Sequence, residues 1–184
     1  GGVVSTTYKA NMDYGTYSSG GTTGDFGDLS QARKDAVGVA NSTRGLNISG
    51  NNGGALNVIE YLTIGTTGNA TDFGNLLATE SQGATVSSST RLLYGGGNGS
   101  SYPGSNVIQY VTIASTGNMS DFGDLTSGRG RSGVGGWAVS SLIRGVFGGQ
   151  TQTDVIDYVT IASTGNATDF GDMQDGFKHI DGGT

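Results

Sequence analysis

The sequence predicts an all-β fold made of one domain, residues 1–184, that contains four copies of a repeat of about 48 residues. The first observation is an Asp-Phe-Gly triplet that recurs along the chain. The second is a Tyr eleven residues before each triplet. The third is the composition, with 36 Gly, one Pro and no run of strong helix formers. The triplets begin at Asp25, Asp72, Asp121 and Asp169, and the tyrosines are Tyr14, Tyr61, Tyr110 and Tyr158.

Each repeat reads as four antiparallel strands. VIDYVTIAS at 155–163 alternates and is rich in β-branched residues, Ser-Thr-Gly-Asn supplies a hairpin turn, and ATDFGD returns as a short strand. A further strand begins at an Arg and ends in Gly, and it is preceded by a strand of small residues. The arginines are Arg44, Arg91 and Arg144, and the small-residue strands are 36–40, 84–88 and 137–141.

A repeat of this length with four antiparallel strands has the size of one propeller blade. The diglycines Gly96-Gly97 and Gly148-Gly149, the Tyr of the third strand and the aromatic residue of the fourth resemble the kelch blade pattern, with Phe in place of the kelch Trp. The resemblance implies a propeller of four kelch-like blades. The wording VIDYVTIASTGNATDFGDM at 155–173 is also similar to repeats of marine bacteriophage virion and tail-associated proteins.

The two ends of the sequence predict how a ring of blades closes. Residues 1–4 fall where the second strand of the first unit is expected, and GFKHIDGGT at 176–184 falls where a first strand is expected. We therefore expect the C-terminal strand to complete the N-terminal blade. A set of four blades within a larger ring is the alternative. Because the sequence opens with Gly-Gly rather than Met, we expect a processed or excised part of a longer protein.

The composition argues against several functions. A formal charge of −6 disfavours binding to nucleic acid. No apolar run reaches the ~20 residues needed for membrane insertion. With no Cys and one histidine, His179, neither a metal site nor galactose-oxidase-like copper chemistry is expected, and no nucleophile elbow or phosphate loop appears. We predict a non-enzymatic protein with no catalytic residue, metal or cofactor.

The repeated polar and aromatic residues are interpreted as structural. The carboxylates of the Asp-Phe-Gly segments lack calcium-loop spacing and are expected to cap turns. The three repeated arginines are expected to pair with a neighbouring turn, for which the Asp of Asp-Phe-Gly is a candidate. Phe73, Phe122 and Phe170 are expected to be buried between blades.

Residues outside the repeat pattern are the candidates for binding. The segment 126–137 is longer than its counterparts and carries Arg129, Arg131 and Trp137, while the longest hairpin loop carries Tyr102. Because glycines flank both arginines, we expect exposed guanidinium groups, and we expect the four residues to form a contact patch for an acidic protein surface or a glycan. The alternative for Trp137 is that it fills the axial channel or a gap between blades.

Two classes of function remain. The first is a structural or adhesion module of a bacteriophage virion or tail fibre, for assembly or host attachment. The second is a glycan-binding, lectin-type propeller of a bacterial surface or secreted protein. The expected partners are other virion or surface proteins, or cell-surface glycans, and the expected location is the virion or the extracellular space. An oligomer is compatible with both.

Overall fold

Every regular element that the structure describes is a β-strand. The computed structural model describes residues 2–4, 7–16, 18–99, 104–130, 137–149 and 154–174, and these ranges contain no helix. The strands are β1 (Gly2–Val4), β2 (Thr7–Lys9), β3 (Asn11–Tyr14), β4 (Gly24–Asp28), β5 (Val37–Ala40), β6 (Arg44–Ile48), β7 (Leu56–Thr63), β8 (Thr71–Glu80), β9 (Ala84–Ser87), β10 (Arg91–Gly95), β11 (Ser105–Thr112), β12 (Ser120–Arg129), β13 (Trp137–Ser140), β14 (Arg144–Gly148), β15 (Val155–Thr160) and β16 (Thr168–Asp172). The all-β prediction is confirmed.

Three repeats each form a four-stranded antiparallel meander. We call β3–β4 the first sheet, β5–β8 the second, β9–β12 the third and β13–β16 the fourth. In the second sheet, Leu46 pairs with Val39 on one side and with Tyr61 on the other. Side chains that are paired across strands in this way lie on the same face of the sheet. The third and fourth sheets repeat this strand order.

The first repeat departs from the expected four strands, because among the described residues its sheet consists of β3 and β4. Residues 2–4, expected to be its second strand, instead pair with β2. In the frame of the repeat, positions 2–4 correspond to 49–51, just past the end of β6 at Ile48. They therefore belong to the hairpin between the second and third strands. The strand expected within 176–184 lies outside the described residues.

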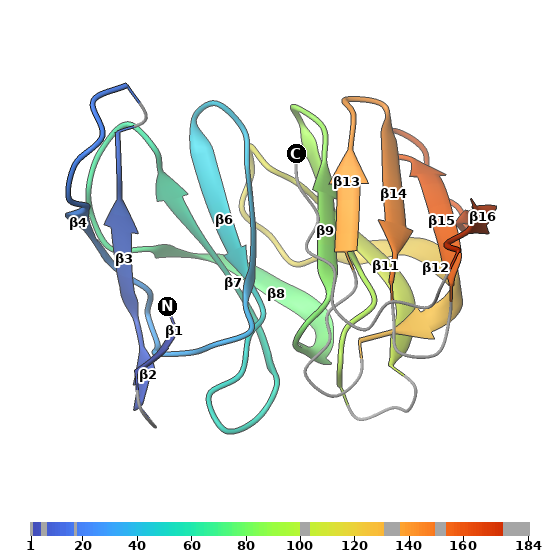
Figure 1. Ribbon diagram of the computed structural model, residues 1–184, viewed down its shortest axis with the longest axis horizontal. Coiled ribbons are helices and arrows are strands. Elements are labelled where there is room, and N and C mark those ends of the chain that lie inside the picture. The colour runs from blue at the N-terminus through green and yellow to red at the C-terminus, as the bar shows by residue number, and fades with distance from the viewer. Residues whose placement is uncertain are drawn as a thin grey trace.

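The sheets stand side by side along the long axis of the molecule (Figure 1). The first sheet lies at one end and β16 lies at the other, while β9 contacts both β5 and β13. The described residues form an open row, and the expected ring of four sheets is not closed by them.

Each sheet is joined to the preceding one by a hairpin turn. We call the turns at 67–70, 116–119 and 164–167 junction turns, and the Asp-Phe-Gly-Asp/Asn segments at 25–28, 72–75, 121–124 and 169–172 acceptor segments. Gly68 N–H donates to the Phe26 carbonyl at 2.7 Å, and Ala70 N–H donates to the Asp28 carbonyl at 2.8 Å. The Asn69 side-chain oxygen accepts the Asp28 N–H at 3.0 Å. The same three bonds connect the second sheet to the third and the third to the fourth.

The glycine of each acceptor segment lets the junction turn approach. A Cβ on Gly74 would lie 2.2 Å from the Gly117 carbonyl oxygen, far inside van der Waals contact. A Cβ on Gly27 or Gly123 would collide with a junction turn in the same way, and all three glycines have φ near +140°. No side chain fits there, so the repeated glycine is a requirement of packing between sheets.

The burial of each repeated phenylalanine depends on whether a further sheet packs on its own sheet. Phe73 and Phe122 are 2% and 3% exposed and belong to apolar clusters with strands of the next sheet. Phe170, expected to be buried as well, is 57% exposed. The reason is that the described residues place no further sheet beyond β16. Each Phe keeps an edge-to-face contact with the Tyr of its own sheet, about 6 Å between ring centres.

The repeated arginines have a structural role but not the expected partner. The Arg44 guanidinium lies 4.3 Å from the centre of the Tyr61 ring and donates to the Ile113 carbonyl of the next sheet at 2.8 Å. Arg91 makes the equivalent contacts with Tyr110 and with the Ile161 carbonyl. A ring face and a backbone oxygen thus replace the expected Asp of the Asp-Phe-Gly segment.

Phe122→Ala should lower the free energy of unfolding by about 3–5 kcal/mol, because it leaves a cavity between two sheets. Phe170→Ala removes an exposed ring from the same motif and should cost about 1 kcal/mol. Urea unfolding of both variants measures the difference. Equal losses would contradict the assignment of Phe122 to the interior of a junction.

Candidate functional site

The predicted contact patch is not assembled by the described residues. Arg129, expected to be exposed, is 2% exposed, because its guanidinium pairs with the Asp157 carboxylate at 2.6 Å and donates to the Val155 carbonyl at 3.0 Å. Tyr102 and Arg131 lie outside the described residues.

Trp137 begins β13 and pairs with Gly148 in the register of the fourth sheet. Its side chain is partly buried, and a Cβ on Gly148 or Gly149 would come within 2.6 Å of the indole ring. The ring therefore lies over the diglycine at the end of β14. This position agrees with the alternative interpretation, in which Trp137 fills space in the fold.

Arg129 belongs to a set of buried pairs at the junctions. At two junctions, the residue eight positions after the triplet Asp forms an ion pair with the residue that precedes the Tyr of the next sheet. At the first junction the pair is Arg33 with Glu60, both 0% exposed, and at the third it is Arg129 with Asp157. Burial lowers the pKa of Arg33 to about 10, which leaves it charged at neutral pH.

The middle junction has different residues at the same two positions. Glu80 replaces the Arg, and Gln109 replaces the acid. The Gln109 side-chain oxygen accepts the Leu77 N–H at 2.7 Å, as Glu60 accepts the Ser30 N–H at the first junction. The side chain before the Tyr thus accepts a backbone N–H at each junction. It is an acid where the other position is an arginine, and a neutral amide where the other position is Glu80.

Among the described residues, no cationic side chain pairs with Glu80, the buried acid at the middle junction. It is 7% exposed, and positions for a Cβ on Gly97 and Gly99 lie within 3 Å of its carboxylate, so glycines make room for it. Burial raises the pKa of Glu80 to about 7, and a hydrogen bond with the Ser105 side chain opposes this shift.

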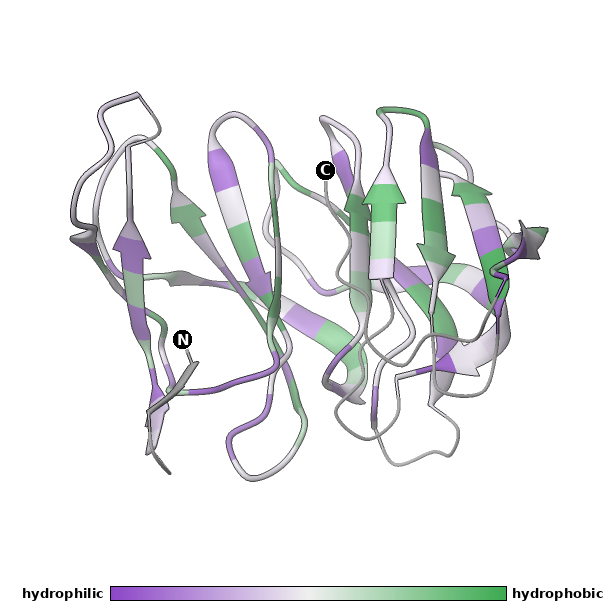
Figure 2. Cartoon of the chain, in the orientation of Figure 1, coloured by the Kyte–Doolittle hydropathy of each residue, from purple (hydrophilic) through white to green (hydrophobic). Residues whose placement is uncertain are grey.

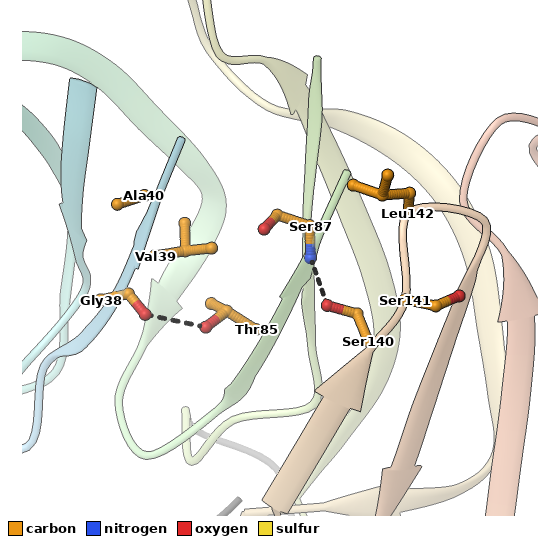
Figure 3. Close-up of a pocket in the computed structure, with 8 residues that line it drawn as sticks. All are labelled: Gly38, Val39, Ala40, Thr85, Ser87, Ser140, Ser141 and Leu142. Atoms are coloured by element: carbon orange, nitrogen blue, oxygen red, sulfur yellow. Dashed lines mark hydrogen bonds between the residues drawn. The ribbon is translucent and has the colours of Figure 1, made fainter. Parts of the chain in front are cut away.

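A groove lies where the inner strands of three sheets meet. We call it the inner-strand groove; it has a volume of about 460 Å³. Its polar lining consists of small hydroxyl side chains: Ser140 Oγ accepts the Ser87 N–H, and Thr85 Oγ1 donates to the Gly38 carbonyl (Figure 3). It is lined by Gly38, Val39, Ala40, Thr85, Ser87, Ser140, Ser141 and Leu142.

The loop at the rim of this groove carries two exposed apolar residues. Leu142 is 74% exposed and Ile143 is 71% exposed, and Figure 2 shows the loop between β13 and β14 as hydrophobic. The equivalent residues are Ser42-Thr43 and Ser89-Thr90 in the other two sheets. The Ser141 side chain caps this turn by accepting the Ile143 and Arg144 N–H groups, as Ser88 caps its own turn. The turn itself therefore does not require apolar residues.

The sequence analysis missed Leu142 and Ile143. An alignment of the repeats shows them, because the other two sheets have Ser-Thr at these positions.

Within the described residues, no group of three or more His, Cys, Asp or Glu side chains gathers in a way that would hold a metal ion. In the same part of the chain, no helix has the length and apolar character needed to cross a membrane.

Comparison with known proteins identifies the fold alone. No protein-family profile matches the sequence, and neither does any curated protein. The structure is similar to the solved structure of YjhT, with a TM-score of 0.64 and 10% sequence identity over 84% of this chain. The chain spans 56% of YjhT. At this identity the similarity extends to the β-sheet architecture and not to activity.

Arg129→Ala should lower the free energy of unfolding by about 3–5 kcal/mol, because it leaves the Asp157 carboxylate buried without its partner. Arg144→Ala, which removes an exposed arginine stacked on Tyr158, should cost about 1 kcal/mol. Thermal and urea unfolding of the two variants measure both costs. An unchanged melting temperature for Arg129→Ala would mean that its guanidinium is exposed.

The contribution of Glu80 to stability should fall as the pH rises from about 4.5 to 7. In this window the unfolded chain releases the Glu80 proton while the folded chain retains it, since burial raises the folded pKa to about 7. Glu80→Gln should remove this part of the pH dependence, because a neutral amide of the same shape does not titrate. Melting temperatures of the two proteins between pH 4.5 and 7.5 give the difference. Parallel curves would contradict the shift.

Proposed function

We propose that this protein is a non-catalytic attachment and assembly module, a component of a bacteriophage virion or tail fibre. The sheets are proposed to be kelch-like propeller blades. The observation that carries the proposal is the exposed Leu142-Ile143 pair at the rim of the inner-strand groove. Exposed apolar residues at a position where the repeat otherwise has Ser-Thr favour contact with another macromolecule.

The use of the repeated polar groups supports a role without catalysis. The Asn of each junction turn binds the preceding sheet, and the repeated arginines lie on tyrosine rings. Arg33 and Arg129 are held in buried pairs with carboxylates. These groups stabilise the scaffold, which leaves the non-repeated surface residues for binding.

A glycan-binding role is the second candidate. It is favoured by the hydroxyl groups of Thr85, Ser87 and Ser140 along the inner-strand groove, since hydroxyls donate and accept hydrogen bonds as sugars do. The volume of about 460 Å³ falls within the range of small-ligand sites. A glycan array probed with the labelled protein distinguishes this candidate from protein-mediated attachment.

Replacing Leu142 and Ile143 with the Ser-Thr of the other two turns should weaken attachment. The Leu142→Ser, Ile143→Thr double variant takes the sequence of the other two turns and should keep the wild-type melting temperature. Because burial of each apolar side chain is worth about 1.5–3 kcal/mol, binding should fall at least tenfold. Co-sedimentation of labelled protein with purified phage particles, and separately with intact bacterial cells, measures binding.

Leu77→Ser is the matched control, since Leu77 is 54% exposed on β8 and does not line the groove. It should bind like the wild type. The proposal fails if the wild type binds neither particles nor cells, or if the double variant binds as well as the wild type.

A further inference from the structure

The hydroxyl groups of the inner-strand groove have a fixed hydrogen-bond polarity, and Thr85 supplies an acceptor. β5, β9 and β13 are the edge strands of their sheets, and β9 lies against the other two. Thr85 Oγ1 lies 3.3 Å from the Gly38 carbonyl oxygen on β5. Because a carbonyl oxygen can only accept, the hydroxyl hydrogen of Thr85 is used in this bond. The Thr85 oxygen is therefore left to a ligand in the groove as an acceptor.

Ser140 on β13 has the opposite polarity. Its Oγ accepts the Ser87 N–H at 3.3 Å, and since a backbone N–H can only donate, the hydroxyl hydrogen of Ser140 stays available to a ligand (Figure 3). Thr85 and Ser87 are two positions apart on β9, about 6.6 Å along the strand. The groove thus presents an acceptor and a donor at a separation that one hexose ring with its hydroxyl groups can bridge.

The lining of the groove is electrically neutral. None of the described residues that line it has an ionisable side chain. The nearby repeated arginines, Arg44 and Arg91, lie on tyrosine rings and donate to backbone carbonyls of the next sheet. A carboxylate or sulfate would find no cation here and would set an acceptor against the Thr85 acceptor. An ammonium group would set a donor against the Ser140 donor. The polarity and the missing counter-charge both favour a neutral ligand.

The same two hydrogen bonds disfavour a peptide strand as the ligand. A peptide that extends a sheet pairs with free backbone groups of an edge strand. On the groove side of β5 and β9, the Gly38 carbonyl and the Ser87 N–H are already bonded to hydroxyl side chains. A sugar needs neither of these groups, because its own hydroxyls donate to Thr85 and accept from Ser140. Val39 and Leu142 add apolar surface for the C–H groups of a sugar ring.

We infer that the inner-strand groove binds a neutral saccharide unit, with one hydroxyl donating to Thr85 Oγ1 and another accepting from Ser140 Oγ. The ligand class is a neutral hexose or an N-acetylated hexosamine, and acidic, sulfated and amino sugars are excluded. The inference rests on the glycan-binding candidate proposed above and specifies its ligand.

A glycan array of matched pairs tests the ligand class. Each neutral glycan is printed beside its carboxylated and sulfated derivatives, and chitin oligomers are printed beside their de-N-acetylated, cationic forms. The labelled chain should bind neutral members and should bind their charged counterparts roughly tenfold more weakly, because the groove offers no compensating charge. Isothermal titration calorimetry then gives the dissociation constant for the neutral glycan with the strongest signal.

Variants of the two hydroxyl residues test the binding geometry. Thr85→Val and Ser140→Ala should each raise this dissociation constant about tenfold, which is the effect of about one net hydrogen bond. Thr85→Ser keeps the hydroxyl and should bind like the wild type. Ser89→Ala is the matched control, since Ser89 is an exposed hydroxyl residue in the turn after β9 that does not line the groove. Melting temperatures establish that each variant is folded.

Three outcomes would overturn the inference. Equal binding of neutral and charged glycans, or wild-type affinity in both Thr85→Val and Ser140→Ala, would do so while the glycan-binding candidate stands. Binding to an array of neutral peptides in place of glycans would assign the groove to a protein partner. Attachment through Leu142 and Ile143 is measured separately with particles and cells, so the protein-mediated function can stand in every case.

Discussion

The packing of one sheet on the next depends on a hairpin turn that rests on a glycine. At each junction, a turn with the sequence Gly-Asn donates two backbone hydrogen bonds to the preceding Asp-Phe-Gly segment and accepts one through its Asn side chain. The close approach requires the absence of a side chain on that glycine. The distance between sheets is therefore set by backbone atoms, and the Phe and Tyr rings pack at the spacing that results.

The buried polar pairs are adapted to this fixed spacing. Because the sheets cannot move apart, the residue eight positions after the triplet Asp is buried whatever its type. Two junctions place an arginine there and pair it with an acid, while the middle junction places Glu80 there and has a neutral amide, Gln109, at the position of the acid. Burying a charge without a partner is costly, so the two positions change together. Glu80 remains the exception, and its raised pKa is the consequence.

Much of the architecture could be predicted from the sequence, because it follows from local pattern and from the repeat. The strands of the last three repeats, their hairpin turns and the burial of Phe73 and Phe122 were predicted correctly, whereas residues 2–4 were wrongly expected to be the second strand of the first repeat. The partners of the arginines were not, since a stacked Tyr ring and a backbone carbonyl leave no distinctive signal in a sequence.

The candidate binding site was harder to predict for a related reason. Arg129 was expected to be exposed because it stands beside glycines, but Asp157, far away in sequence, buries it. The state of Phe170 depended on a neighbouring sheet that the motif implies and the described residues do not supply. In both cases the deciding factor was a contact between repeats, which the residues next to Arg129 and Phe170 in the sequence do not specify.

The uniformity of the junctions has an evolutionary consequence. Since every junction uses the same short turn and the same glycine, a unit of about 48 residues could be duplicated or lost in the gene without creating a new kind of interface. The turn of the first repeat has Thr22 where the three junction turns have Asn. Variation in the number of units among related genes would change the length of the row of sheets while leaving the chemistry of each contact intact.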